Sequence, residues 1–398
     1  MNRKSVMIFG VGSLQKSIIE HCKKKGLFIV GIDPDENAVC KDIVDSFEIV
    51  DGNDYDKTLN VAKKHNIQGL ITAATDKPLV MMARIAKDLD LSFYTVETAQ
   101  YSTDKYLMKQ KFNEFNIPCA KGFIVNHETD IDVLKIDYPV IIKPRDNSGS
   151  RGVISCENLK ALKKSIKETF KFTKKGNILV EEFIEGQEYS VESIHYKDKS
   201  HVIQITEKKT TKFPYNVELG HLQPASVTLR QKLDIEDVII KIAKALGFEN
   251  CASHTELKIN SKGIKIIETS PRLGGDFISS TLVPLSTGVN MEDLLIDISI
   301  KKPLVNKYYL PKKNVNAAII FFELKEGLIV DNVNLDEIND IKSIYAWSFD
   351  LKKGNKINKI TSSLNRYGYA IVFNYQRKNL FSDINKINLI LNKNINIK

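Results

Sequence analysis

The sequence has no long apolar segment and no paired cysteine motif. No hydrophobic run approaches the about 18 residues that a transmembrane helix requires, and the N-terminus lacks a signal-peptide pattern. We therefore expect a soluble, cytoplasmic protein with no membrane partner. The cysteines are too scattered for a CxxC pair, so neither a zinc ribbon nor a disulfide framework is indicated, and we expect reduced core thiols at Cys22, Cys40, Cys119, Cys156 and Cys251.

The sequence also lacks a concentrated basic patch. Lys and Arg outnumber Asp and Glu by 58 to 49, but the lysines are spread along the chain and are not gathered with aromatic residues. The net charge of +9 is therefore interpreted as general surface composition with a phosphate pocket, and no nucleic-acid partner is expected. A length of 398 residues suits two or three domains, and 42% hydrophobic residues are enough to form their cores.

Residues 1–95 alternate short apolar strands with helical patterns, which predicts a parallel sheet of the Rossmann type. The first strand runs into the segment from Gly10 to Gln15 (GVGSLQ), and the second strand ends at Asp33. This spacing is similar to a dinucleotide-binding fold, in which an acidic residue binds ribose. Gln15 stands where that fingerprint has glycine, so the glycines are interpreted as packing residues, with an NAD-dependent oxidoreductase as an alternative. Asp76 is predicted to cap the helix that follows it.

A hairpin over 252–276 is predicted to place two carboxylates on one face. The pattern reads as two strands joined by a three-residue turn between Asn260 and Ile264, and counting back along both strands puts Glu256 opposite Glu268. Like charges at opposed positions destabilise a hairpin unless a cation compensates them. The two glutamates are therefore candidate ligands of a divalent ion that also binds substrate phosphates. A surface hairpin with scattered charges is the alternative interpretation.

Three upstream segments carry residue types that suit phosphates and a nucleotide. Lys105 and Lys109 lie on one face of a predicted helix, a face that by itself would be solvated. Further on, an apolar strand ends at Lys143, and the small residues after it can bring backbone N–H groups to phosphate oxygens, unless they form a simple hairpin: Ser148, Gly149, Ser150, Arg151 and Gly152. An extended segment then offers backbone groups and carboxylates for a purine and a ribose: Glu181, Glu182, Phe183, Ile184 and Glu188.

The order of these pieces resembles the ATP-grasp ligases. A lysine at a helix start, a strand-borne lysine with a glycine-rich loop, the segment VEEFIEGQE, and two glutamates followed by Pro-Arg occur in that family's order. The resemblance covers residues 1–375 and implies a multidomain fold of the α/β and α+β classes. It divides the chain into a Rossmann-like domain (1–95), a two-lobed ATP-grasp domain (96–302, with its lid lobe at 120–186), and a small β-rich closing lobe with a tail (303–398).

The resemblance also implies an activity and its cofactors. In that family ATP is held between two lobes, Mg²⁺, or Mn²⁺, bridges its phosphates, and a carboxylate attacks the γ-phosphate to form an acyl phosphate that an amine then displaces. The substrates would be a small-molecule carboxylate and an amine, and the protein would be a homodimer, because related enzymes are often dimers. The nucleotide-binding residues implied are Lys105, Lys143, Ser148, Gly149, Ser150, Gly152, Glu181, Glu182, Phe183, Ile184 and Glu188.

The same resemblance assigns the metal and the acyl phosphate to the hairpin. Glu256, Glu268 and Ser270 would ligate magnesium, although many family members have asparagine in place of Ser270, which is a better acceptor than a hydroxyl group. Arg272 would stabilise the acyl phosphate and the tetrahedral intermediate that follows it.

Two segments resemble the L-amino-acid ligase branch, namely 218–225 and 272–276. In this interpretation His221 orients the amine or takes its proton, although a satisfied core histidine remains the alternative. The backbone of Gly274 and Gly275 would approach the substrate, and Asp276 would either pair with an ammonium group or cap a helix that begins at Phe277.

The sequence therefore predicts an ATP-dependent carboxylate–amine ligase that releases ADP and phosphate and acts on an amino-acid substrate. One alternative is a purine-pathway or biotin-type carboxylating enzyme that uses formate or bicarbonate. The other is a non-catalytic ATP-binding regulator, for which Ser270 is the only sign in the sequence.

Overall fold

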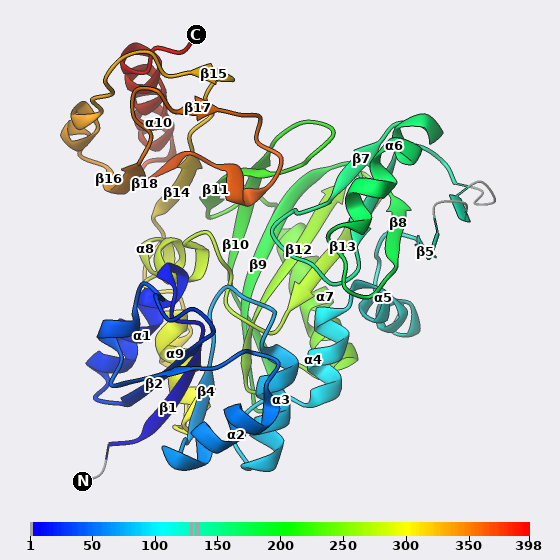
Figure 1. Cartoon of the computed structure of the whole chain (residues 1–398), viewed down its shortest axis with the longest axis vertical. Helices are drawn as coiled ribbons and strands as arrows, with labels where there is room; N and C mark the ends of the chain where they lie inside the picture. Colours follow the sequence, from blue (N-terminus) through cyan, green and yellow to red (C-terminus); the bar gives the residue numbers. More distant parts are fainter. Residues whose placement is uncertain (1–2, 128–129, 132–135) are drawn as a thin grey trace.

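The computed structural model describes residues 3–127, 130–131 and 136–398 (Figure 1). Its N-terminal part is a four-stranded parallel sheet in the order β3-β2-β1-β4, which confirms the predicted Rossmann-like fold. The strands are β1 (Ser5–Phe9), β2 (Phe28–Asp33), β3 (Ser46–Ile49) and β4 (Gly69–Ile71). The helices of this part of the chain are α1 (Lys16–Lys24), α2 (Tyr55–Lys64), α3 (Leu79–Asp88) and α4 (Val96–Thr103).

The glycine turn after β1 is filled by the chain's own side chains. Gln15 accepts a hydrogen bond from the Gly12 N–H at 3.2 Å and donates one to the Ala73 carbonyl at 2.6 Å. The Asp33 carboxylate accepts from the Val11 N–H at 2.8 Å. These are the backbone amides and the acid that a bound dinucleotide would need, so the geometry supports the packing interpretation of the glycines over an NAD site.

An eight-stranded antiparallel sheet forms the centre of the molecule, in the order β13-β12-β9-β10-β11-β14-β18-β16. The strands expected for a separate closing lobe continue this same sheet, because β14 pairs directly with β11. The strands are β9 (Gln187–Tyr196), β10 (Lys199–Thr210), β11 (Glu218–Gln223), β12 (Cys251–Asn260), β13 (Gly263–Ser270), β14 (Asn316–Phe321), β16 (Ile344–Phe349) and β18 (Gly368–Asn374).

A smaller four-stranded sheet in the order β5-β8-β6-β7 lies beside the central one (Figure 1). It consists of β5 (Gly122–Val125), β6 (Val140–Pro144), β7 (Ile154–Cys156) and β8 (Ile178–Glu182), with helix α6 (Leu159–Phe170) packed on β6 and β7. Its apolar side chains form a core of their own, including Val140, Leu162 and Val180. This sheet lies within residues 120–186, for which a lid lobe stays a prediction.

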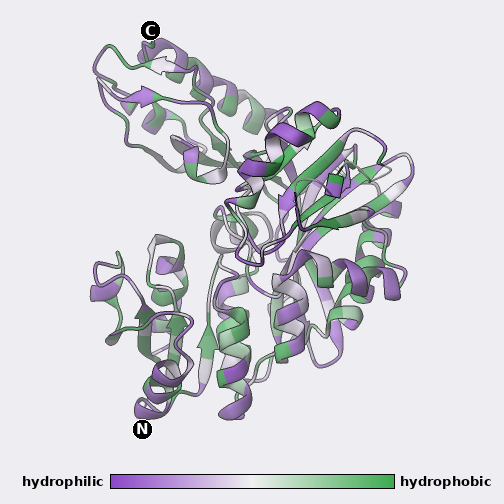
Figure 2. Cartoon of the chain, turned by 45° about the vertical axis from the view of Figure 1, so that its right-hand side comes forward, coloured by the Kyte–Doolittle hydropathy of each residue, from purple (hydrophilic) through white to green (hydrophobic). Residues whose placement is uncertain are grey.

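Helices cover the sheets with their apolar faces inward, as Figure 2 shows by hydropathy. Helices α5 (Lys105–Glu114) and α7 (Leu229–Leu246) pack against each other, and α9 (Met291–Ser299) packs on α1 and β4. The short helix α8 (Val283–Thr287) precedes α9, and α10 (Arg377–Asn394) packs on β18. A two-stranded sheet, β15 (Gly327–Leu328) with β17 (Lys356–Ile357), completes the C-terminal part.

The predicted hairpin forms, but by a different turn. Asn260 pairs with Gly263 instead of Ile264, so the loop has two residues, and the Asn260 side chain tightens it by accepting the Lys262 N–H at 2.8 Å. The register then shifts between Leu257 and Glu256, which restores the pairing of Glu256 with Glu268. The predicted turn was wrong, and the predicted opposition of the two carboxylates is confirmed because a β-bulge supplies the missing residue.

Two simpler expectations concern the cysteines and membrane spans. All five cysteines are buried free thiols, as predicted. In the part of the chain that the structure describes, no helix combines the length and the apolar character needed to span a bilayer.

We predict that Phe112→Ala destabilises the fold by about 3–5 kcal/mol, because this fully buried ring joins α5 to the core shared with α7. Urea unfolding followed by circular dichroism measures the change. The matched control is Phe381→Ala on α10, where the ring is 46% exposed and the loss should be small. Equal stability losses in the two variants would contradict this packing.

Candidate functional site

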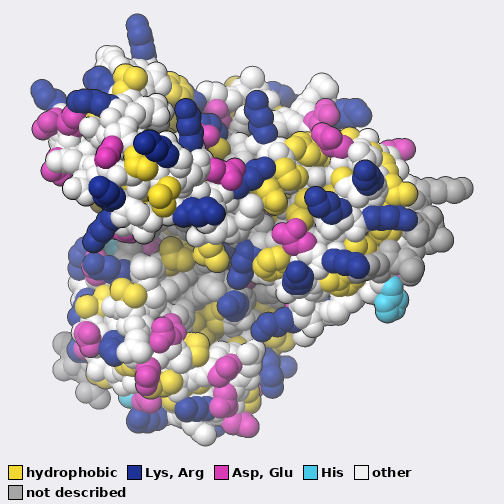
Figure 3. Space-filling view, turned by 45° about the horizontal axis from the view of Figure 1, so that its top comes forward, with side chains coloured by type: hydrophobic (Ala, Val, Ile, Leu, Met, Phe, Trp, Pro, Cys, Tyr) yellow, Lys and Arg dark blue, Asp and Glu magenta, His cyan; other side chains and the backbone are white. Residues whose placement is uncertain are grey.

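A cavity of about 810 Å³ lies where the parallel sheet, the glycine-rich loop and the hairpin meet. Figure 3 shows a hollow between the parts of the molecule with Lys and Arg side chains along its borders. The cavity lining contains six Lys or Arg residues and four acidic ones. The basic residues are Lys77, Lys105, Arg151, Lys174, Lys175 and Arg272. This excess of positive charge suits a polyanionic ligand such as a triphosphate.

The two opposed glutamates are compensated by cations of the chain itself. The Lys208 ammonium group lies 2.6 Å from the Glu256 carboxylate, and the Lys105 ammonium group lies 3.0 Å from that of Glu268. Burial alone would raise the pKa of Glu256, but Lys208 and His254 outweigh it and hold this pKa well below its ordinary value. The Glu256 carboxylate is therefore available in its charged form.

Two carboxylates can hold a divalent ion when a bound substrate supplies further oxygen ligands, such as phosphate oxygens. Within the described ranges, no group of three or more His, Cys, Asp or Glu side chains forms a metal site. Magnesium is commonly held by one or two carboxylates together with substrate phosphates, so two opposed glutamates beside a basic cavity match that requirement. The Ser270 hydroxyl group instead donates to Asp76 at 2.6 Å, and its part in metal binding stays a prediction.

Two cations near Glu256 were missed by the sequence analysis. Lys208 on β10 is buried and lies within 3.4 Å of three carboxylates, those of Glu188, Glu218 and Glu256. His254 contacts Glu192 at 2.6 Å. Burial alone would lower the pKa of His254, but the adjacent carboxylates raise it to about 10. Its position two residues before Glu256 on one strand face could have revealed it; no sequence pattern marks Lys208.

Lys105 links three parts of the site. Asp104 caps α5 through the N–H groups of Tyr106 and Leu107, so Lys105 lies at the first position of the helix. Its ammonium group donates to the Asn147 carbonyl at 2.7 Å as well as contacting Glu268. The lysine therefore joins the helix, the glycine-rich loop and the hairpin.

The glycine-rich segment is a hairpin loop between β6 and β7. Gly149 and Gly152 have left-handed backbones, with φ of 69° and 71°, and a Cβ at Gly152 would lie 2.6 Å from the Phe172 ring. Ser148 and Arg151 line the cavity, and the Arg151 side chain donates to the Ser148 carbonyl at 3.0 Å. The loop thus borders the basic cavity, where phosphate contact remains the prediction.

A buried charge cluster lies at the expected purine end. The Glu181 carboxylate accepts from Lys143 at 2.8 Å and lies 3.3 Å from Lys109, which is buried and not solvated as its helix face suggested. Burial lowers the pKa of Lys143. The second oxygen of Glu181 is buried and has no hydrogen-bond partner among the described residues. Such an acceptor fits an incoming N–H group of a purine.

The remaining nucleotide candidates follow β8. The Phe183 N–H donates to the Pro139 carbonyl at 3.1 Å, and the Ile184 carbonyl accepts from Lys258 at 3.1 Å. Glu182 is bound to the Lys121 backbone at 3.1 Å, whereas Glu188 lies on Lys208. The Phe183 N–H and the Ile184 carbonyl thus form hydrogen bonds within the protein. Contact of these two residues with adenine stays a prediction, as does contact of Glu188 with ribose.

The sequence predicted that Asp76 caps a helix, and this prediction was wrong, because α3 begins after Pro78. Its carboxylate accepts from Arg272 at 2.7 and 3.0 Å in a two-pronged ion pair. This charged, bidentate geometry is stronger than a neutral cap, which explains the difference. The pair joins the N-terminal sheet to the end of β13.

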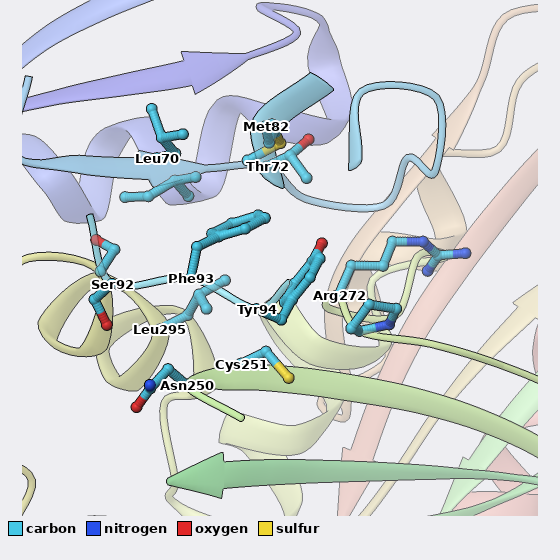
Figure 4. A pocket seen from close by; sticks show the side chains of 13 residues that line it. Leu70, Thr72, Met82, Ser92, Phe93, Tyr94, Asn250, Cys251, Arg272 and Leu295 are labelled. Atoms are coloured by element: carbon cyan, nitrogen blue, oxygen red, sulfur yellow. The ribbon is translucent and has the colours of Figure 1, made fainter. Parts of the chain in front are cut away.

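A small cavity of about 20 Å³ lies beside Arg272, lined by Phe93, Tyr94 and Cys251 among others (Figure 4). Figure 4 shows the guanidinium group pointing away from these side chains. This volume admits about one water molecule. Arg272 also lines the large cavity, so its side chain lies between the two spaces.

The candidate substrate residues form a second ion-pair cluster. His221 lies 3.2 Å from Asp276, whose two oxygens each accept from Arg366 at 2.6 Å. Asp276 does not cap a helix, because the π-helical turn Ile278–Leu282 has Phe277 at its start and no side-chain cap. Nδ1 of His221 is buried and has no partner in the described part of the chain.

The glycine pair has an unexpected use. The Gly274 N–H was predicted to approach the substrate. It instead donates to the Ser279 hydroxyl group at 2.8 Å. A Cβ at Gly274 would lie 2.8 Å from both Glu192 and His254, which is why glycine is needed there. Arg366, which belongs to the loop before β18, was missed because the sequence does not reveal that this loop reaches Asp276.

Comparison with known proteins gives a consistent family. Residues 136–280 match the model of the ATP-grasp domain. Alanine–anticapsin ligase from Bacillus amyloliquefaciens is 26% identical over 253 residues, which are 57% of this chain and 53% of that protein. The chain thus spans about half the length of such curated relatives.

Solved structures match over the whole chain. Phosphoribosylglycinamide synthetase from Anaerococcus prevotii superposes with a TM-score of 0.74 at 25% identity and covers 100% of both chains. L-amino acid ligase from Bacillus licheniformis superposes with a TM-score of 0.83 at 19% identity, over 100% of this chain and 99% of that one, a likeness of fold. This chain therefore contains a segment, residues 136–280, that matches the ATP-grasp domain, and it shares its overall architecture with these two enzymes.

Proposed function

We propose that this protein is an ATP-dependent carboxylate–amine ligase that forms an amide bond through an acyl phosphate and releases ADP and phosphate. The observation that carries this proposal is one basic cavity in which Glu268, Lys105 and Arg272 lie together, with Glu256 directly opposite Glu268. The proposal includes the domain division at residues 95 and 302 and the use of ATP with Mg²⁺.

The residues would divide the work by position. Lys105 and the loop from Ser148 to Gly152 would hold the phosphates, while Lys143 and Glu181 would bind at the purine end. Glu256 and Glu268 would ligate magnesium, which neutralises phosphate charge when bound. Arg272 would stabilise the negative charge that develops on the acyl group, since Asp76 already fixes its orientation.

The amine needs a proton acceptor before it can attack. His221 suits this role because its Nδ1 is buried without a partner while its Nε2 is oriented by Asp276 at 3.2 Å. The names of the relatives support an amino-acid substrate, since one is an alanine–anticapsin ligase and one structural neighbour is an L-amino acid ligase.

A second candidate is a purine-pathway enzyme. It is favoured by the full-length match to phosphoribosylglycinamide synthetase and by the extension of the large cavity to Gly10 and Asn53, which lie in the loops after β1 and β3. A crevice at the carboxyl ends of parallel strands is a common place for a phosphorylated substrate.

One assay separates these functions. Phosphate release from ATP and Mg²⁺ is measured with single amino acids, amino-acid pairs, bicarbonate, formate, and glycine with ribose 5-phosphate derivatives, and ADP is distinguished from AMP. The proposal expects ADP only with a particular amino acid and amine. Stimulation by bicarbonate or formate would favour the carboxylating or formate-using alternatives, and ATP binding without any release would favour a regulator.

We predict that Glu268→Gln reduces turnover by at least about 100-fold and leaves the fold intact, because it removes one charged ligand from the proposed metal pair. ADP release across a magnesium titration and circular dichroism test this. The control is Glu326→Gln on the exposed surface. Unchanged activity of Glu268→Gln would remove metal ligation from the account.

We predict that Arg272→Lys lowers kcat by about 100-fold or more and changes the KM for ATP little, since its charge partner develops only during the reaction. Steady-state kinetics of the variant measures both constants, with the exposed Arg230→Lys as control. An equal loss in ATP affinity would assign Arg272 to nucleotide binding instead.

A further inference from the structure

A second, smaller cavity of about 190 Å³ lies between α1 and the turn that follows Arg272. Its lining comes from α1 and the turn before it, from the loop after β4, from the turn 273–281 and from Glu292 on α9. It holds only a small molecule, because a water molecule in the liquid occupies about 30 Å³. The nucleotide residues proposed above do not line this space.

The two cavities meet at a crossing of two chain segments. Ala73 and Ala74 line the small cavity, and the next residues, Thr75 and Asp76, line the large one. In the same way Ser270 and Arg272 line the large cavity, and residues 273–277 line the small one. The ion pair of Asp76 with Arg272 holds the segments together at this point.

The side chains at the crossing are small. A Cβ added to Gly275 would lie 3.5 Å from Cβ of Ala74, so the two segments approach closely with little side-chain bulk between them. A group held by Arg272 in the large cavity is therefore a short distance from a molecule in the small one.

The two cavities differ in the charged residues that line them. The large one has an excess of Lys and Arg, whereas the small one has three acidic residues, Glu20, Asp276 and Glu292, against Lys16 alone. Arg366 neutralises Asp276, and Ser17 donates to Glu292 at 2.6 Å. Glu20 is solvent-exposed, and the hydroxyl groups of Ser280 and Thr281 add acceptors. Carboxylates and hydroxyl oxygens are the groups that bind an ammonium ion.

We infer that the small cavity binds the amine substrate, a small primary amine of amino-acid size, and this inference rests on the proposed function. The nitrogen forms a bond to the acyl carbon across the crossing while the bond from that carbon to the phosphate oxygen breaks. One proton of the ammonium group passes to His221, the acceptor proposed above, whose partner Asp276 lines this cavity, and the second leaves with the phosphate.

Hydroxylamine separates activation of the acid from attack by the amine, because it converts an acyl phosphate to a hydroxamate without needing a built amine site. ATP, Mg²⁺, hydroxylamine and each amino acid in turn first identify the acid. ADP release with that acid is then titrated with each of the twenty amino acids and with ethanolamine, in the wild type, Glu20→Gln, Ser280→Leu and the exposed control Glu36→Gln.

The inference expects a saturable amine whose KM rises about tenfold in Glu20→Gln and Ser280→Leu, while the KM of the acid in hydroxamate formation stays within about twofold. Glu36→Gln should match the wild type. An unchanged amine KM in both variants, a changed acid KM, or no acceleration by any amine would overturn the inference. Absence of hydroxamate with every acid in the wild type would overturn the proposed function itself.

Discussion

The ion pair between Asp76 and Arg272 is the contact on which the site depends. It ties the loop after β4 to the end of β13, and the same carboxylate accepts the Ser270 hydroxyl group. Both side chains are largely shielded from water, and breaking such a pair by removing one partner costs about 3–5 kcal/mol. In the proposed function, the N-terminal sheet would therefore take part in the chemistry by fixing the guanidinium group of Arg272 beside the large cavity.

Around this contact the charges are separated by position. Cations outnumber acids in the lining of the large cavity, Glu268 lines this cavity with Glu256 opposite it on the neighbouring strand, and acidic and hydroxyl groups line the smaller cavity beyond the crossing. Lys208 and His254 keep the carboxylates around Glu256 from repelling one another. In the proposed function, this arrangement would let a polyanion and an ammonium compound bind next to each other without sharing ligands.

The sequence predicted what depends on local order. Strand alternation predicted the parallel sheet, and spacing along the hairpin predicted that Glu256 faces Glu268, even though the turn was one residue shorter and a bulge made up the difference. What it could not predict depends on contacts between distant segments. Asp76 looked like a helix cap, Lys109 looked solvated, and Lys208 and Arg366 had no motif, because their partners lie up to 196 positions away.

The acyl phosphate is the central claim, and isotope transfer tests it most directly. The acid identified by the hydroxamate assay is labelled with ¹⁸O in its carboxylate and incubated with ATP, Mg²⁺ and the amine, and the released phosphate is analysed by ³¹P NMR. Attack of the carboxylate on the γ-phosphate transfers one ¹⁸O atom to inorganic phosphate, which is the result that this account predicts. Phosphate free of the label, or label found in AMP, would contradict it.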